Sequence, residues 1–156
     1  MHRIFPKDLD NLYILAAILN STLQAYFVLL SGRSNLGAGA LKFETVDARQ
    51  LLILDPNSLT EDERKILIEG ITRMGIRRPS SLFVECGLDP RFEIKNQIPE
   101  PLPDRKMIDD VIFDALNLNG TERIALYHST CELVKKRLKK AKILNNKKQF
   151  VTKSKA

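Results

Sequence analysis

The sequence predicts a predominantly helical α+β domain with a long buried N-terminal helix, a small sheet of two or three short strands, and a C-terminal helical pair. Three observations support this fold class. One charge-free apolar segment is long enough for a central helix, later segments place apolar residues at helical spacing, and short apolar runs in mid-chain end at turn residues. At 156 residues and 44% hydrophobic composition, the chain has the size and composition of one folded domain.

The N-terminal segment 8–31 is expected to form one helix. Asp8 and Asp10 would lie in its first turn, where acidic side chains favour a helix N-terminus. Segment 12–30 carries no charge and has the length of a membrane span, but its centre is polar, which favours a buried helix and no membrane contact. This polar patch is expected to bond neighbouring backbone or a second helix, and it comprises Asn20, Ser21, Thr22 and Gln24.

The strands are expected in the middle of the chain. After a loop that contains three glycines, segment 40–43 reads as a short strand and 46–50 as a helical turn. The apolar run 51–54 reads as a second strand, because Asp55-Pro56-Asn57 stops it, and Leu82–Glu85 reads as a possible third strand.

A better-defined helix begins after Thr60. Thr60 and Glu63 have the spacing of a capping box, and the helix is expected to end at Gly75. Its apolar residues fall on one face and comprise Ile66, Leu67, Ile71 and Met74.

The C-terminal part is expected to be a helical pair. A proline-rich connector, 99–103, separates the α+β region 1–98 from helices over 104–116 and 121–144, which pack on the same domain. The first helix would begin at Asp104 and turn Ile108, Val111, Ile112 and Ala115 inward. The second carries a continuous apolar stripe of Ile124, Tyr127, Cys131, Val134, Leu138 and Ala141. Segment 145–156 reads as a basic, disordered tail.

Charge is distributed unevenly along the chain. The formal net charge is +6, but residues 120–156 hold 11 basic and 2 acidic side chains, and the first 119 residues hold 14 basic and 17 acidic ones. A mildly acidic body therefore precedes a strongly basic end, which could contact phosphates or could simply be a solvated face.

Small-molecule catalysis and metal binding find no support in the sequence. Cys86 and Cys131 lie far apart and read as core residues, and His2 and His128 are isolated, with His128 expected to be partly packed on a helix. The start of the chain lacks the pattern of a secretory signal, so a reducing cytoplasm is the expected location. No catalytic, cofactor-binding or metal-binding residue is expected in this chain.

Three stretches in order are similar to the C-terminal region of N6-adenine-specific DNA methyltransferases of restriction-modification systems. They are LYILAAILNSTLQAYF, then GRSNLGAGALKFETVDARQLLILDP, and then MIDDVIFDALNLN followed by ERIALYHSTCELVKKRLKKAK. In that family a helix with a Leu-Asn-Ser core leads to a glycine loop, a short strand, a proline-ended segment and later a helical pair. The resemblance covers most of the chain and implies target recognition or the holding of double-stranded DNA.

The catalytic signatures of the family are absent from the sequence. There is no S-adenosylmethionine loop and no N-P-P-Y/F motif to hold a flipped adenine; the nearest fragments, Asp55-Pro56-Asn57 and Asp89-Pro90-Arg91, lack the aromatic residue. We therefore expect no methylation by this chain alone, with S-adenosylmethionine belonging to the parent family or a partner. A detached fragment, a split-gene subunit and a truncated remnant all stay open.

The resemblance and the charge pattern indicate candidate DNA-binding residues. Arg33, Ser34, Asn35 and Lys42 map to the glycine loop, where arginine can read guanine, asparagine can read adenine and lysine can bind phosphate. The alternative is structural: Asn35 would serve turn geometry alone, and Arg33 would neutralise a helix C-terminus. Arg77 and Arg78 form a second, smaller basic spot that could equally be a solvated turn. Phosphate contacts are expected from Lys135, Lys136, Lys139 and Lys140.

Two functions from different classes follow. The first is a DNA-binding, target-recognition part of an adenine methyltransferase. The alternative is a helical module that binds a catalytic subunit or a second copy without touching DNA, because the apolar 12–30 segment offers more surface than a short chain easily buries.

Overall fold

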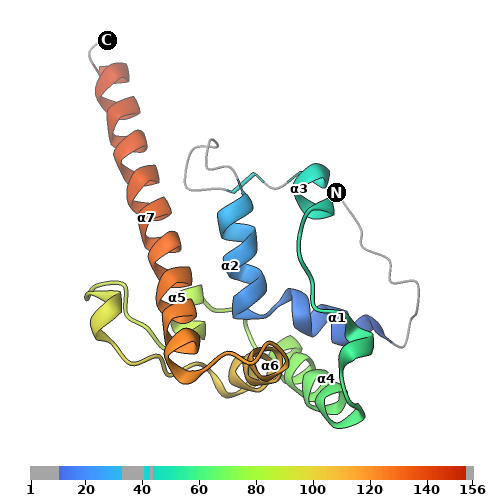
Figure 1. Ribbon diagram of the computed structural model, residues 1–156. Coiled ribbons are helices and arrows are strands. Elements are labelled where there is room, and N and C mark those ends of the chain that lie inside the picture. Colours follow the sequence, from blue (N-terminus) through green and yellow to red (C-terminus); the bar gives the residue numbers. More distant parts are fainter. Residues whose placement is uncertain (1–10, 33–40, 43, 154–156) are drawn as a thin grey trace.

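The structure, a computed structural model, describes residues 11–32, 41–42 and 44–153, with 144–153 as backbone only, and shows helices joined by loops (Figure 1). Within these ranges there is no strand, and only Lys42 takes part in an isolated bridge, so the predicted small sheet is wrong. The elements are α1 (Leu12–Leu19), α2 (Thr22–Ser31), α3 (Thr45–Arg49), η3 (Pro56–Ser58), α4 (Glu61–Ile76), α5 (Leu82–Glu85), η4 (Ile94–Asn96), α6 (Pro103–Ala115) and α7 (Gly120–Lys153).

The predicted strands fail for local reasons. Leu82–Glu85 is the short helix α5, because the Ser81 hydroxyl accepts a hydrogen bond from the Val84 amide at 3.4 Å and caps it. Segment 51–54 is irregular, has no strand beside it among the described residues, and leads into η3, which Asp55 caps. A short apolar run is compatible with a helix or with a strand, so the capping residues decide which of the two forms. Most of the first predicted strand, 40–43, lies outside the described residues.

The predicted single N-terminal helix is two helices. α1 and α2 meet at a bend of 62°. Ser21 starts α2, with its hydroxyl accepting a hydrogen bond from the Gln24 amide at 3.1 Å. Asn20, the C-cap of α1, donates its side-chain amide to the Ala16 carbonyl at 2.9 Å. The polar residues at the centre of the segment thus end one helix and begin the next.

α4 forms as predicted and packs closely on α6. Thr60 and Glu63 form the capping box, with the Glu63 carboxylate accepting from the Thr60 amide at 2.7 Å. Gly70 is buried at the contact: a Cβ there would lie 2.8 Å from the Ile108 side chain and 3.3 Å from the Asp104 carbonyl oxygen. The missing side chain therefore lets the two helices approach each other.

α6 lies between two hydrophobic cores. The first comprises Ile14, Ala17, Ile18, Leu59, Leu67, Ile108, Val111 and Ile112. The second comprises Phe83, Cys86, Leu88, Ile94, Phe113, Tyr127, Cys131 and Val134. Both cysteines are buried free thiols, as predicted. Because α6 contributes to both cores, it holds the N-terminal helices and α7 in one body.

The proline-rich connector is tied to α5. The Leu102 amide donates to the Glu85 carbonyl at 3.0 Å. Gly87, with φ +64°, lies against the connector so closely that a Cβ would be 2.0 Å from the Glu100 carbonyl oxygen. α6 then begins at Pro103, one residue before the predicted Asp104.

α7 is the longest element. It begins after the Asn117–Gly120 break, where Asn117 has φ 54°, and runs to Lys153, beyond the Leu144 end expected from the sequence. Its first half lies beside α2, and its second half projects away from the other helices (Figure 1). No single described helix is long and apolar enough to cross a membrane, although α1 and α2 together, despite their bend, have the required length and composition.

Candidate functional site

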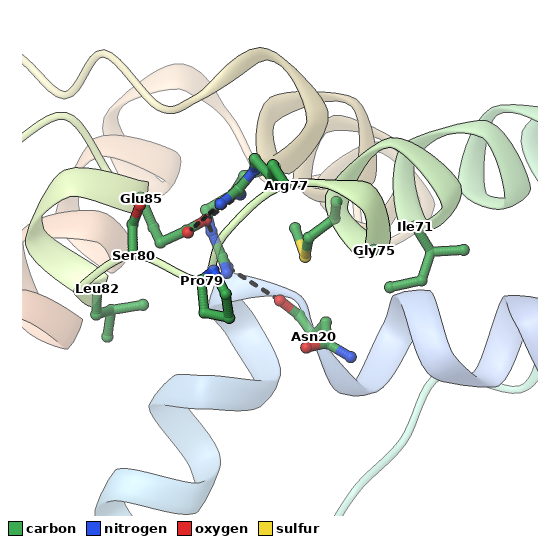
Figure 2. Close-up of a pocket in the computed structure, with 10 residues that line it drawn as sticks. Asn20, Ile71, Gly75, Arg77, Pro79, Ser80, Leu82 and Glu85 are labelled. Atoms are coloured by element: carbon green, nitrogen blue, oxygen red, sulfur yellow. Dashed lines mark hydrogen bonds and ion pairs between the residues drawn. The ribbon is translucent and has the colours of Figure 1, made fainter.

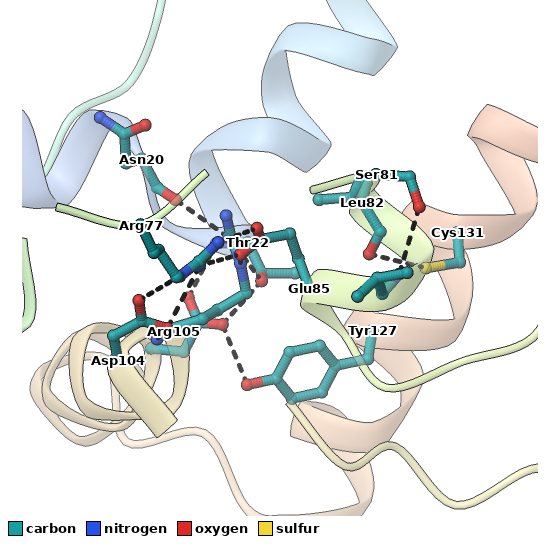
Figure 3. Close-up of polar contacts among 12 residues, drawn as sticks. Asn20, Thr22, Arg77, Ser81, Leu82, Glu85, Asp104, Arg105, Tyr127 and Cys131 are labelled. Atoms are coloured by element: carbon teal, nitrogen blue, oxygen red, sulfur yellow. Dashed lines mark hydrogen bonds and ion pairs between the residues drawn. The ribbon is translucent and has the colours of Figure 1, made fainter. Parts of the chain in front are cut away.

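Two side chains of α6 hold the break between α1 and α2 (Figure 3). Arg105 donates from Nη1 to the Asn20 carbonyl at 2.9 Å and to the Thr22 hydroxyl at 3.3 Å. Asp109, one helical turn later, accepts from the Thr22 amide at 2.7 Å, the Thr22 hydroxyl at 2.6 Å and the Tyr127 hydroxyl at 3.0 Å. A cation therefore meets the carbonyl end of α1 and a carboxylate meets the amide end of α2, as helix dipoles favour.

Arg105 also belongs to a buried ion-pair cluster with Arg77. Glu85 accepts from Arg105 Nε at 2.9 Å and from Arg77 Nη1 and Nη2 at 2.7 and 2.6 Å. Asp104 accepts from Arg77 Nε at 2.5 Å. These two bidentate contacts hold the end of α4, α5 and the start of α6 together.

The cluster sets the protonation of its acids. Burial alone would raise the pKa values of Glu85 and Asp104, but hydrogen bonds from Arg77, joined at Glu85 by Arg105, lower both. The same contacts raise the pKa of Arg77. Asp109 is fully buried, and burial raises its pKa more than the Thr22 and Tyr127 donors lower it.

A pocket of about 510 Å³ opens beside this cluster (Figure 2). Its apolar wall comes from Ile71, Met74 and Leu82, and its polar wall from residues that include Asn20, Ser80 and Arg105. Arg77 and Glu85 line it too, but their charged groups already bond one another. The arrangement suits a structural junction better than catalysis, because no activated nucleophile or base faces the pocket.

Exposed lysines cluster in the middle of α7. Lys136, Lys139, Lys140 and Lys142 are exposed on this helix. Lys135 is half-buried and donates to the Phe92 carbonyl at 2.8 Å. The four exposed ammonium groups have no ion-pair partner within the described part of the chain, and such a run of cations suits phosphate contact.

A smaller hollow of about 290 Å³ lies next to these lysines, between α2, η4 and α7. Tyr26 and Leu30 of α2 and Leu133 of α7 form its apolar part. Its polar part comprises Lys95, His128, Ser129, Glu132 and Lys136. His128 is partly packed, as predicted, with Nε2 at 2.8 Å from the Gln97 carbonyl.

The structure separates the remaining sequence-predicted residues. Arg33, Ser34 and Asn35 lie outside the described residues. Lys42 pairs with Glu44 at 2.7 Å, and Arg78 is exposed. Arg77 lies with Glu85 and Asp104 in the ion-pair cluster, with all of its donors occupied.

Sequence reasoning missed the roles of Arg105, Asp109 and Lys95. Arg105 and Asp109 are four residues apart, so the sequence predicts that they share one face of α6. The α1–α2 break that they bind, however, lies more than 80 positions away in the sequence. Lys95 gave no signal, because η4 brings it to α7 only through tertiary packing. Among the residues described, no group of His, Cys, Asp or Glu could hold a metal ion.

Comparison with known proteins identifies no relative: no family model, curated protein or solved structure matches this chain.

Proposed function

We propose that this chain is a DNA-binding, target-recognition part of an N6-adenine-specific DNA methyltransferase of a restriction-modification system. The observation that carries the proposal is the run of exposed lysines in the middle of α7, where the helix leaves the body. The ordered sequence resemblance described above supports the methyltransferase context. Because the sequence contains no S-adenosylmethionine loop and no N-P-P-Y motif, methylation and its cofactor belong to a catalytic domain outside the segments described.

α7 suits backbone contact better than base reading. Lysine ammonium groups bind phosphates as point charges and carry little sequence information, whereas bases are read by planar or amide side chains. The exposed cations in the described part of α7 are lysines, so this helix supplies affinity and register. Sequence preference is then assigned to the glycine-loop residues, of which Arg33 and Asn35 have the appropriate side chains.

Fluorescence anisotropy with duplex DNA at increasing salt tests the proposal. Binding should weaken steeply with salt, and replacing Lys136, Lys139 and Lys140 together by alanine should flatten the log–log salt slope by up to about 2.7, at about 0.9 per phosphate contact. Lys65→Ala on α4 is the matched control, because Lys65 is exposed and pairs only with Asp62. Absent binding, or binding with no salt dependence, would contradict DNA recognition.

Sequence preference is tested separately from affinity. Removal of residues after Leu144 should weaken binding to all duplexes equally, because phosphate contacts are not sequence-specific. Arg33→Ala or Asn35→Ala should instead change the ranking of duplexes in a competition assay against a randomised pool. An unchanged ranking of duplexes in both variants would show that the glycine loop takes no part in target recognition.

A second function, a protein-interaction module for a catalytic subunit or a second copy, is favoured by one observation. Leu12 and Tyr13 of α1, and Leu52 and Ile53 of the irregular 51–54 segment, are exposed, with Leu52 at 73%. Light scattering distinguishes the two functions. A monomer with salt-dependent DNA affinity supports DNA binding, and an oligomer indifferent to DNA supports the interaction module.

A further inference from the structure

We infer that the hollow between α2, η4 and α7 is a phosphate-binding site, and that Lys95 and Ser129 extend the basic surface of α7 onto the body. The inference deepens the proposed function and rests on it where the phosphate belongs to a DNA backbone. The shared chemistry is a phosphate group, which a DNA backbone or a small phosphorylated molecule could supply.

The hollow is built by docking of the 89–97 segment on α7. Ile94 is fully buried in the second core and anchors η4. On either side of it, the Phe92 carbonyl accepts from Lys135 at 2.8 Å and the Gln97 carbonyl lies 2.8 Å from His128 Nε2. These three anchors fix Lys95, which directly follows Ile94, at the edge of the hollow.

Hydrogen bonds within the 89–97 segment also hold its shape. The Gln97 side chain accepts from the Asp89 amide at 2.8 Å and donates to the Asp89 carbonyl at 2.9 Å, which closes the loop on itself. Arg91 pairs with Asp89, so neither of these charges competes for a ligand in the hollow. Hydrogen bonds on both sides thereby hold the backbone of Lys95, so little backbone entropy is lost when its ammonium group binds an anion.

The chemistry of the hollow fits a phosphate. Lys95 and Lys136 are exposed and have no ion-pair partner in the described part of the chain, and the Ser129 hydroxyl, which lines the same hollow, can donate a hydrogen bond. The two lysines come from different elements, so they can approach an anion from two sides. Glu132 also lines the hollow and opposes an anion, which makes its removal a diagnostic change.

Lys136 is shared by the hollow and by the exposed face of α7, so a ligand in the hollow can be continuous with one on the helix. A DNA backbone bound along α7 would then continue toward α2 and η4, which line the same hollow.

Duplex-DNA anisotropy at several salt concentrations, with the full chain, is the first arm of the test. Lys95→Ala should weaken binding and flatten the salt slope by about 0.9, because one phosphate contact is lost. Ser129→Ala should weaken binding without changing the slope, because no charge is removed. Glu132→Gln should tighten binding, and Lys65→Ala, the control on α4, should change neither quantity.

The second arm uses inorganic phosphate as the probe, added at constant ionic strength against chloride. A free-phosphate site should shift the amide NMR signals of Lys95 and Ser129 in a saturable way, and Lys95→Ala should abolish the shift. Slope changes in the DNA arm support a backbone phosphate, and saturable shifts without an effect on DNA support a small phosphorylated ligand.

The outcomes separate this inference from the proposed function. If Lys136, Lys139 and Lys140 govern DNA affinity while Lys95→Ala and Ser129→Ala have no effect and inorganic phosphate causes no shift, the hollow is not a phosphate site although α7 binds DNA. If the chain binds no DNA but phosphate shifts Lys95 and Ser129, the site stands and the proposed function fails. Circular dichroism of each variant verifies that the helices are intact, since every altered residue lies at the surface or is half-buried.

Discussion

Removing the carboxyl group of Asp109 should destabilise the protein more than removing that of its neighbour Asp110. Asp109 is fully buried and accepts hydrogen bonds from the Thr22 amide, the Thr22 hydroxyl and the Tyr127 hydroxyl. Asp109→Ala leaves these three donors without an acceptor and leaves a small cavity. At about 1 kcal/mol or more for each orphaned donor, we expect a loss of about 3–5 kcal/mol.

A graded series of variants makes the prediction specific. Asp109→Asn keeps one oxygen acceptor and the side-chain volume, so it should lose less, about 1–2 kcal/mol. Asp110→Ala is the neighbouring control: Asp110 is partly exposed and pairs with Lys106 and Arg123 at the surface, where ion pairs contribute about 0–1 kcal/mol.

Urea denaturation followed by circular dichroism at 222 nm gives the free energy of unfolding for each variant. The expected order of loss is Asp109→Ala, then Asp109→Asn, then Asp110→Ala, with a similar denaturant dependence in all three. A loss below about 1 kcal/mol for Asp109→Ala, or a loss equal to that of Asp110→Ala, would refute the assignment of Asp109 as the residue that holds the helix break.

Three further predictions concern pH and packing. Glu85 and Asp104 have lowered pKa values when folded, so the stabilisation linked to their ionisation is present above about pH 4.5 and is lost as the pH falls. Asp109 has a raised pKa, so protonation of Asp109 adds stability below about pH 4 that is lost as the pH rises, apart from its hydrogen bonds. Because these effects oppose each other, Asp109→Asn should make the free energy of unfolding rise more steeply between about pH 3 and 6, and a parallel pH profile would contradict the raised pKa. Gly70→Ala should lower the melting temperature because its Cβ would meet Ile108 at 2.8 Å, whereas Gly75→Ala in the same helix faces open space and should raise stability by about 0.5–1 kcal/mol; the same sign for both would count against the close α4–α6 contact. Thr60→Ala should cost about 1 kcal/mol by removing the α4 capping box, and no loss in urea denaturation would show that the box is dispensable.

The parts of the fold that could be predicted were those with local signals. The Thr60–Glu63 capping box, the apolar face of α6 and the break near Asn117 are encoded within a few residues, and each was found where expected. The bend between α1 and α2 was not predicted, because a charge-free apolar segment reads as one helix. What breaks it is Ser21 together with two α6 side chains far along the chain.

In the candidate site, too, the sequence predicts the features that depend on neighbouring residues and misses those that depend on distant ones. The lysines of α7 were visible in the sequence as a charge run, and their exposure follows from it. Arg77 also looked like a basic surface residue, yet it lies in the ion-pair cluster, because the sequence does not reveal that Glu85 and Asp104 lie within reach. Lys95 had no distinguishing neighbours and joins the α7 surface only through the docking of η4.

The hydrogen bonds at the helix break join residues that are far apart in the sequence, and this delays folding during synthesis. Thr22 and Asp109 are separated by 87 positions, and the carbonyl of Asn20 meets Arg105 across 85. At a synthesis rate of about 5–20 residues per second, the N-terminal helices wait roughly 4–17 s on the ribosome before α6 is made. During that interval α4 can already pack on α1, but the apolar surface that packs on α6 and α7 has no native partner. Nascent chains should therefore depend on chaperones until the second half emerges, and folding should be slow for a helical protein because many of its contacts are non-local.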